Sequence, residues 1–344
     1  MTGVPRPAGS LRPEVERLRP GLWSIPVPLP TAGLTHVFMY LFETDHGAYV
    51  IDSGWDTDEA FAAVERGLAA AGYAVTDLRG IIPTHMHPDH YGLAGRLREA
   101  SGAWIGLHPA DAAVLRVEPL HPADLLRTLN EAMLRAGAPP EAMREVTAQH
   151  LPRDPLPGFA RPDILIEDGD RLDIPGWDLR AVWTPGHSPG HLCFWEPVNR
   201  LLLSGDHVLP RITPNIPFGG EAGDDPLGDY LRSLDKVDAL SATATLPAHE
   251  YRFDGLSERV EQLRRHHEQR FAEVRAALAG GPATGWEVAS QMRWSRPWDE
   301  IEGFVRRSAV SEALAHLRAL ERRGVVHERP GEPPTWWLTA SAGG

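Results

Sequence analysis

Cysteine, lysine and long apolar runs are nearly absent from this chain. Cys193 is its one cysteine, which excludes an internal disulfide framework and is typical of a reducing compartment. Lysine occurs only as Lys236, and a net charge of −13 disfavours a surface that attracts nucleic acid in general. No apolar run reaches the ~20 residues that cross a bilayer, and residues 1–10 carry no apolar leader. We therefore expect a cytoplasmic protein without membrane contact.

The chain does contain a cluster of metal-ligand side chains. His85, His87, Asp89 and His90 lie within six residues, directly after the apolar stretch Gly80–Pro83. Imidazoles at i and i+2 of an extended segment point the same way, and a turn after them would aim Asp89 and His90 at a second position. Imidazole nitrogen and carboxylate oxygen are ligands that zinc and similar ions take. The alternative is a solvated histidine-rich turn, which would leave the next observation unexplained.

Three further strand-like stretches each end on a ligand type. The runs 179–183, 201–205 and 245–248 are apolar, and they lead to His187, Asp206 and His249 respectively. His191 lies four residues after His187. An isolated histidine or aspartate is usually structural, but four such transitions in one chain indicate a metal centre built from strand ends.

With these motifs the chain resembles the metallo-β-lactamase superfamily. The resemblance rests on the pattern H-x-H-x-D-H at 85–90, followed by His187, Asp206 and His249 in order, and on the early strand-ending loop Val50–Gly54. It covers about residues 18–256. It implies an α/β fold, a four-layer αβ/βα sandwich of two facing sheets with helices outside and metals at one edge.

The same resemblance implies a ligand set for two divalent metal ions. His85, His87 and His187 would hold one ion, and Asp89, His90 and His249 the other, with Asp206 bridging both. Zinc is the expected metal, with iron and manganese as alternatives because such sites accept all three. Asp52 is expected to hold a ligand imidazole from behind, with a purely structural role as the alternative.

That ligand set predicts a binuclear metal-dependent hydrolase. Two neighbouring ions lower the pKa of a shared water, and the resulting hydroxide is the nucleophile. Asp89 is the candidate that orients this water and moves its proton, so Asp89 and Asp206 are the predicted catalytic residues. The position of Asp206 is where broad-spectrum β-lactamases of the superfamily carry a cysteine, which argues against true β-lactamase action.

The chain divides into three predicted parts. Residues 1–17 are rich in proline and arginine and are expected to form a loose arm, and residues 18–256 form the catalytic domain. Within it, the segment of about 109–162 is an insertion with a helix over Ala123–Ala136, expected to be a helical cap beside the metals. The alternative is an insertion packed elsewhere.

Residues 257–344 are predicted to form a separate domain. The pattern is a long helix ended by Gly280-Gly281, a short helix over 286–292, a helix over 308–323, and a hairpin over 325–338. This order resembles a winged-helix domain, which an endoribonuclease-like branch of the superfamily carries at this position. The exposed face expected for the last helix is mixed in charge, namely Ser311, Glu312, His316, Arg318, Glu321, Arg322 and Arg323. Nucleic-acid contact is therefore not favoured over a structural or homodimerising role.

Weaker candidates surround the predicted metals. Arg211 and Phe218 lie in the proline-rich loop after Asp206, and Tyr91 follows His90, so each is a candidate substrate contact. His191 is a candidate for supporting a ligand or for touching substrate, with packing as the alternative.

Three activities agree with these residues. The preferred one is hydrolysis of a thioester, ester or lactone carbonyl of a small molecule, as in the glyoxalase-like branch. The alternatives are phosphodiester cleavage of single-stranded RNA and, less favoured, a mononuclear iron persulfide oxygenase. Retention of Asp89, His90 and His249 disfavours the oxygenase, which would use three ligand positions only.

Overall fold

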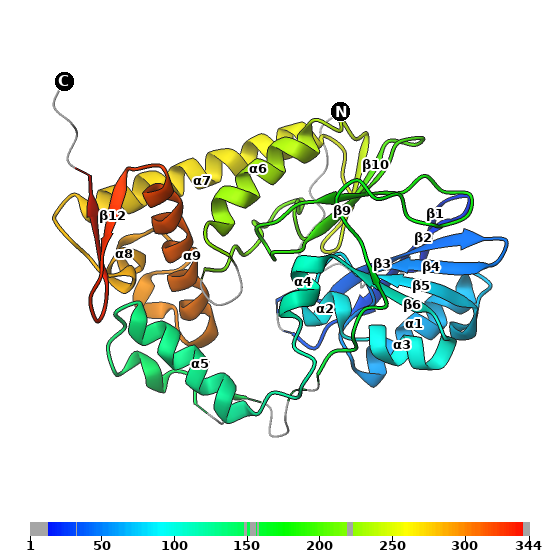
Figure 1. Cartoon of the computed structure of the whole chain (residues 1–344), viewed down its shortest axis with the longest axis horizontal. Coiled ribbons are helices and arrows are strands. Elements are labelled where there is room, and N and C mark those ends of the chain that lie inside the picture. Colours follow the sequence, from blue (N-terminus) through cyan, green and yellow to red (C-terminus); the bar gives the residue numbers. More distant parts are fainter. Residues whose placement is uncertain are drawn as a thin grey trace.

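Two facing β-sheets with helices outside them make up most of the molecule (Figure 1). This computed structural model describes residues 13–31, 33–147, 150–151, 156, 158–218 and 223–339. The larger sheet holds, in spatial order, β1 (Glu16–Arg19), β2 (Leu22–Pro28), β3 (His36–Thr44), β4 (Gly47–Ile51), β5 (Leu78–Ile82), β6 (Trp104–Leu107) and β7 (Ile164–Leu165). The smaller sheet holds β11 (Ala244–Pro247), β10 (Leu201–Gly205), β9 (Leu192–Glu196) and β8 (Arg180–Trp183), again in spatial order.

Helices lie outside the sheets and form most of the C-terminal part. They are α1 (Asp58–Ala70), α2 (Pro88–Tyr91), α3 (Ala94–Ser101), α4 (Pro109–Val114), α5 (Pro122–Arg135), α6 (Pro226–Asp238), α7 (Leu256–Leu278), α8 (Gly285–Gln291) and α9 (Gly303–Arg322). A hairpin of β12 (Val326–Arg329) and β13 (Thr335–Leu338) follows α9. In the described part of the chain, no helix is long and apolar enough to cross a membrane.

The central core lies between the two sheets. Alternate residues of β3, Phe38, Tyr40 and Phe42, face this core, and they pack with Phe194 of β9 and Leu203 of β10. Side chains alternate across a strand, so the residues between them point to the opposite face of the sheet. Because β3 is covered on both faces, its sequence is apolar almost without interruption.

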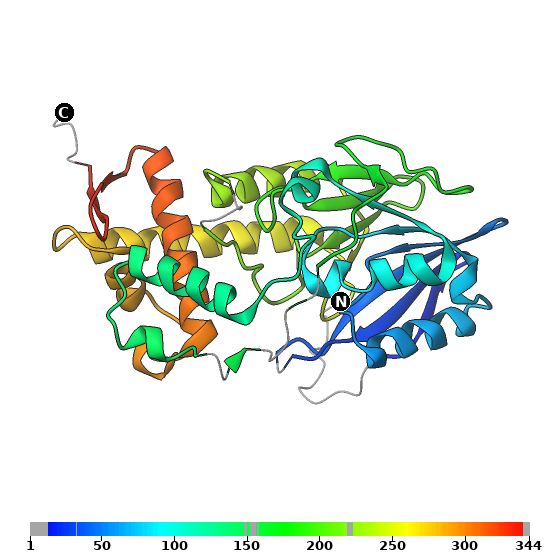
Figure 2. The same cartoon turned by 60° about the horizontal axis from the view of Figure 1, so that its bottom comes forward.

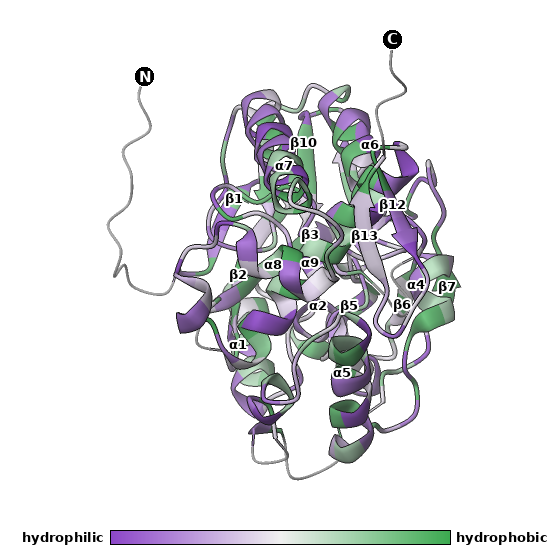
Figure 3. Ribbon diagram, turned by 90° about the vertical axis from the view of Figure 1, so that its left-hand side faces the viewer, coloured by the Kyte–Doolittle hydropathy of each residue, from purple (hydrophilic) through white to green (hydrophobic). Residues whose placement is uncertain are grey.

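Outer helices complete the four layers. Val64 and Leu68 of α1 pack with Val37, Met39 and Leu41 on the outer face of the larger sheet. Residues of α6 and α7 cover the outer face of the smaller sheet in a second cluster, where Leu234 and Val260 join Cys193 and Leu202. The ribbon of β10 is largely hydrophobic, whereas α7 outside it alternates in character (Figure 3). The predicted four-layer sandwich is thus confirmed.

Strand direction brings the predicted ligands to one edge. β4 and β5 run parallel in the larger sheet, and β10 and β11 run parallel in the smaller one. Carboxyl ends of parallel strands meet at the same edge of a sheet. Asp52, His85, Asp206 and His249 follow those four strands, so the topology gathers them.

Two boundaries differ from the sequence analysis. Of the predicted arm, residues 1–12 lie outside the described residues, whereas Glu16–Arg19 forms β1 and pairs with β2, so the arm does not reach residue 17. At the other boundary, α7 begins at Leu256 and packs on the smaller sheet with its first turns. The predicted division at 256 therefore falls at the start of one continuous helix.

The insertion packs mainly on the C-terminal helices. Met133 of α5 and Ala136, which follows the helix directly, share a buried cluster with Val288 of α8 and Val310 of α9. Arg307 of α9 donates to the carbonyl of Leu129 at 2.7 Å and to Oδ1 of Asn130 at 2.8 Å. Figure 2 shows α5 alongside the C-terminal helices. Both described ends of the insertion, α4 and the stretch at Phe159 and Ala160, lie against the catalytic sandwich, whereas α5 packs on the C-terminal helices. The segment predicted as a single cap over 109–162 is thus divided between two parts of the molecule.

The C-terminal part follows the predicted order of three helices and a hairpin. α9 begins at Gly303, five residues before the predicted start of 308. His316, expected on its exposed face, is buried, and its Nε2 lies 3.1 Å from Nδ1 of His267 of α7. That expectation was wrong because α9 packs between α6, α7 and α8 and leaves little of its surface free. The winged-helix assignment stays a prediction.

We expect Arg307→Ala to loosen the contact between α5 and α9. The substitution leaves the carbonyl of Leu129 and Oδ1 of Asn130 without their donor in a partly buried contact, which costs about 1–3 kcal/mol of unfolding free energy. Urea unfolding and the rate of proteolytic cleavage within residues 115–147 measure the effect. The matched control is Arg127→Ala on the exposed side of α5, where Arg127 pairs only within its own helix. Solvent screens such exposed pairs, so Arg127→Ala should change the unfolding free energy much less, and equal losses for the two variants would contradict the coupling.

Candidate metal centre

Four loops and a short helix bring the predicted ligands together. His85 and His87 lie in the extended loop after β5, and Pro88 then starts α2, which carries Asp89 and His90. Proline is favoured at the first position of a helix, so the sequence itself sets the turn that redirects the chain. His187, Asp206 and His249 come from loops after β8, β10 and β11.

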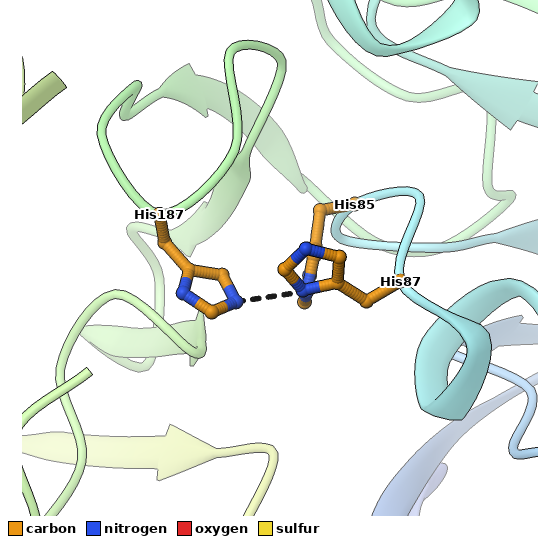
Figure 4. A group of neighbouring side chains, drawn as sticks. All are labelled: His85, His87 and His187. Atoms are coloured by element: carbon orange, nitrogen blue, oxygen red, sulfur yellow. Dashed lines mark hydrogen bonds between the residues drawn. The ribbon is translucent and has the colours of Figure 1, made fainter. Parts of the chain in front are cut away.

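The first group of ligands is a triad of histidines. Nε2 of His85 lies 2.8 Å from Nδ1 of His87 and 3.2 Å from Nε2 of His187 (Figure 4). The three rings meet roughly edge to face, with interplanar angles of 78°, 80° and 87°. Three imidazole nitrogens therefore converge on one point from two different loops.

The second group contains a carboxylate and two histidines. The ligand atoms of Asp89, His90 and His249 lie within 4.8 Å of one another. Nε2 of His249 lies 3.3 Å from Oδ2 of Asp89, and Nε2 of His90 lies 3.6 Å from the same oxygen.

Asp206 lies between the two groups. Its Oδ2 is 3.5 Å from Nε2 of His187, whereas its Oδ1 is 3.3 Å from Nε2 of His249 and 3.6 Å from Nε2 of His90. Each carboxylate oxygen thus faces a different group. This is the arrangement that the predicted bridging role requires.

Hydrogen bonds behind the rings fix which nitrogen faces the centre. Nδ1 of His187 donates to the carbonyl of Asn215 at 2.7 Å, and Nδ1 of His249 donates to the carbonyl of His36 at 2.9 Å. A carbonyl only accepts, so Nδ1 carries a proton and Nε2 is the nitrogen left to bind a metal. Both Nε2 atoms point into the centre, as a metal ligand requires.

Asp52 and Thr84 fix the ring orientation of two more ligands, His90 and His85. Oδ2 of Asp52 lies 3.0 Å from Nδ1 of His90, and its Oδ1 accepts from the Thr84 hydroxyl at 2.9 Å. Because that hydroxyl donates to Asp52, its oxygen is free to accept from Nδ1 of His85, 3.0 Å away. Asp52 adopts a φ of 63°, a left-handed conformation that aspartate tolerates better than most residues. The strand end turns sharply there and points the carboxylate at the centre.

Several atoms of the site have no hydrogen-bond partner in the part of the chain that the structure describes. Nε2 of His90, Nε2 of His249 and Oδ1 of Asp206 are buried and make no hydrogen bond in the described residues. Buried polar atoms are normally paired, and groups without partners call for a water or an ion. All three atoms face the space between the ligand groups, so a divalent cation would satisfy them together.

Burial and neighbouring charge set the protonation of the ligands. Burial lowers the pKa of His85 and His187, and it lowers the pKa of His87 to about 3, so this triad is neutral. Burial also acts on His249, but the carboxylates of Asp206 and Asp89 outweigh it and raise the pKa to about 10. The same negative potential would favour a metal cation, which Nε2 of His249 would hold in place of the proton.

His191, predicted to support a ligand, is fully buried behind Asp206. Its Nε2 accepts from the backbone N–H of Asp206 at 3.1 Å, and its Nδ1 lies 2.8 Å from the Thr184 hydroxyl. Gly205 precedes Asp206 with a φ of 50°, and a Cβ there would lie 2.6 Å from Nε2 of His191. A glycine is therefore needed for β10 to end against this imidazole.

The three predicted substrate contacts occupy different environments. Arg211 is largely exposed and pairs with Oε1 of Glu250 at 2.8 Å. Phe218 is half-buried, and its N–H donates to the Ser311 hydroxyl of α9 at 2.9 Å. Tyr91 is fully buried, and its hydroxyl donates to the carbonyl of Ala160. Tyr91 therefore belongs to the core and has no surface for a substrate.

Sequence reasoning missed several supporting groups. Thr84 lies between Pro83 and His85 and was open to inference as a polar residue at a strand end. The carbonyl of Asn215 gave no such signal, because any residue supplies a carbonyl. The sequence also gave no reason to place Arg259 of α7 near the site. It donates to the carbonyls of Leu209, Arg211 and Ile212 in the loop after Asp206.

Comparison with known proteins identifies the family. The sequence profile described as "Metallo-beta-lactamase superfamily" matches residues 32–249, which include every predicted ligand. The chain belongs to the metallo-beta-lactamase superfamily.

Relatives of this superfamily member extend over nearly its whole length. "Probable metallo-hydrolase YqjP" of Bacillus subtilis is 26% identical over 310 residues, covering 88% of this chain and 93% of that protein. A metallo-beta-lactamase family protein of Thermus thermophilus has a similar structure, with a TM-score of 0.74 and 32% identity over 94% of this chain and 100% of that one. A beta-lactamase domain protein of Burkholderia ambifaria reaches a TM-score of 0.77 at 26% identity, covering 96% of each chain. The chain is thus a metal-dependent hydrolase whose histidines and aspartates form the metal-binding clusters.

We expect Asp206→Ala to lower the amount of metal bound per chain. The substitution removes the carboxylate that faces both ligand groups, so both should bind a divalent ion more weakly. Elemental analysis after dialysis against zinc measures the loss. The control is Asp225→Ala, which removes the N-cap of α6 at a cost of about 1 kcal/mol and leaves every ligand in place. An Asp206→Ala protein with the metal content of the unmodified protein would contradict the bridging position.

Proposed function

We propose that this metallohydrolase uses two divalent ions, zinc in the first instance, to hydrolyse a thioester, ester or lactone carbonyl of a small molecule. The single observation that carries the proposal is the position of Asp206, with one carboxylate oxygen toward each ligand group. When bound, two ions so placed would lower the pKa of a shared water and polarise the carbonyl oxygen.

The side chains around the ions divide the remaining work. Asp206 would hold both ions, and Asp89 would accept and return the proton of the attacking water. The nearby His90 and His249 outweigh the effect of burial and lower the pKa of Asp89 to about 2, so this carboxylate is ionised and can accept a hydrogen bond that orients the water. Asp89 also keeps some exposure, at 19% of its side chain, which a group in contact with water and substrate needs.

The charge pattern of the C-terminal part supports a carbonyl substrate over RNA. Three arginines on α7, on α9 and directly after α9 pair with acidic residues of the protein itself: Arg270 with Glu273 and Glu312, Arg318 with Glu321 and Glu328, and Arg323 with Glu268. Binding of a nucleic-acid backbone depends on cations that are free to replace counterions. Together with the net charge of −13, this pairing favours a substrate that is not a polyanion.

Cleavage of single-stranded RNA is the second candidate, and the order of helices and hairpin after the catalytic domain is what favours it. The iron persulfide oxygenase would need only three ligands and would leave Asp89, His90 and His249 without a use. Homodimer formation and a cytoplasmic location remain predictions from sequence.

A substrate panel tests the proposal. We expect zinc-loaded protein to hydrolyse acyl thioesters or lactones and to leave single-stranded RNA intact. Asp206→Ala serves as the blank and should lower the carbonyl-directed kcat by at least about 100-fold, the scale on which removal of transition-state stabilisation acts. RNA cleavage that disappears in the Asp206→Ala protein would replace the proposal with the nuclease alternative.

A further inference from the structure

Asp111 is a buried carboxylate that the proposed reaction does not use. It lies in the first turn of α4 and has no exposed surface. Its Oδ2 accepts from the backbone N–H of Met86 at 2.9 Å and from the Ser188 hydroxyl at 2.9 Å, and its Oδ1 accepts from the N–H of Gly190 at 2.6 Å. Burial raises the pKa of Asp111 to about 6, and the three donors oppose this rise.

The three donors belong to the two loops that carry the histidine triad. Met86 lies between His85 and His87, so its N–H belongs to the backbone that positions both rings. Ser188 directly follows His187 in the loop after β8, and Gly190 lies two residues further on. The first loop comes from the larger sheet and the second from the smaller one. A single carboxylate thus joins the two halves of the sandwich at the point where the triad meets.

Gly190 provides an independent sign of this contact. A Cβ at position 190 would lie 2.5 Å from the backbone nitrogen of Asp111 and 2.7 Å from its Cβ. Real Cβ atoms do not approach other heavy atoms so closely, so the loop after His187 packs on α4 only because residue 190 is glycine. Gly190 therefore fits against Asp111 by shape as well as by its hydrogen bond.

We infer that Asp111 is a positioning residue that sets the spacing of His85, His87 and His187 and thereby the affinity of the triad for a metal ion. This inference rests on the proposed metal centre. The physical reason is that a ligand triad binds tightly only if its atoms are held at the coordination distance before the ion arrives. Groups that orient ligands from behind commonly contribute 10-fold to 100-fold in metal affinity.

The test is the binding of Co²⁺ to the metal-free full-length protein, followed by visible absorption and by isothermal titration calorimetry. Asp111→Asn is the informative variant. Its amide nitrogen replaces one of the two accepting oxygens, and because this nitrogen only donates, it cannot accept from the donor that faces it. We expect one class of Co²⁺ sites to weaken by about 10-fold to 100-fold, with an altered absorption spectrum, while the other class is less affected.

A matched control separates metal affinity from general stability. Glu196 is also a buried carboxylate, and it accepts from the backbone N–H groups of Val198 at 3.1 Å and Asn199 at 2.8 Å in the turn between β9 and β10. Glu196→Gln should lower the melting temperature and leave Co²⁺ affinity unchanged. If Asp111→Asn does not fold, Ser188→Ala removes only one of the three donors, and a loss of affinity of about threefold to tenfold is expected for one hydrogen bond.

Each outcome has a distinct meaning. Weakened Co²⁺ binding in Asp111→Asn or Ser188→Ala, but not in Glu196→Gln, supports the inference. Unchanged binding in the Asp111 and Ser188 variants overturns it and leaves the proposed function intact. A protein of unmodified sequence that binds no Co²⁺ and no Zn²⁺ would overturn both.

Discussion

The structure depends on one unfavourable arrangement, a carboxylate buried among imidazoles whose ring nitrogens point at the same small space. Asp206 is 8% exposed, and the neighbouring His85, His90 and His249 are fully buried. Burying such groups costs free energy unless each finds a partner. The hydrogen bonds behind His187 and His249 prevent those rings from turning their Nδ1 atoms inward. A divalent cation is the partner that satisfies imidazole nitrogens and carboxylate oxygens at once. The fold holds these groups together, and a bound cation would offset the free-energy cost of burying them.

The supporting contacts come from every layer around the site. Asp52 ends a strand of the larger sheet, Asp111 lies on a short outer helix, and the carbonyl of Asn215 belongs to a loop after the smaller sheet. Asp52 and the carbonyl of Asn215 each hold a ligand ring by the nitrogen that does not face the centre, whereas Asp111 holds the two loops that carry the triad. Because these contacts lie on different elements, the ligand geometry depends on correct packing of both sheets. The sandwich therefore acts as the rigid support that a preformed metal site needs.

The sequence predicts the ligand side chains well, but it predicts fewer of the groups that orient those ligands. Histidines and aspartates at the ends of apolar strands are recognisable because metal binding restricts residue type. The supports at Asn215 and Gly190 act through the backbone, and a backbone carbonyl or N–H leaves no trace in residue identity. The fold of the sandwich was implied by the family resemblance. The position of α5 did not, because the apolar face of a helix indicates that it packs but not on which partner.

The loop from Leu209 to Phe218 connects the C-terminal helices to the metal centre. Arg259 of α7 holds the start of this loop through three carbonyls, and Ser311 of α9 holds its end through the backbone of Phe218. Between these anchors lies the Asn215 carbonyl, which orients His187. A shift of α7 or α9 would therefore move a group in direct contact with a metal ligand. Since α5 packs on α8 and α9, the insertion and the loop that orients His187 both contact the C-terminal helices, and the geometry of the metal centre depends on how those helices pack.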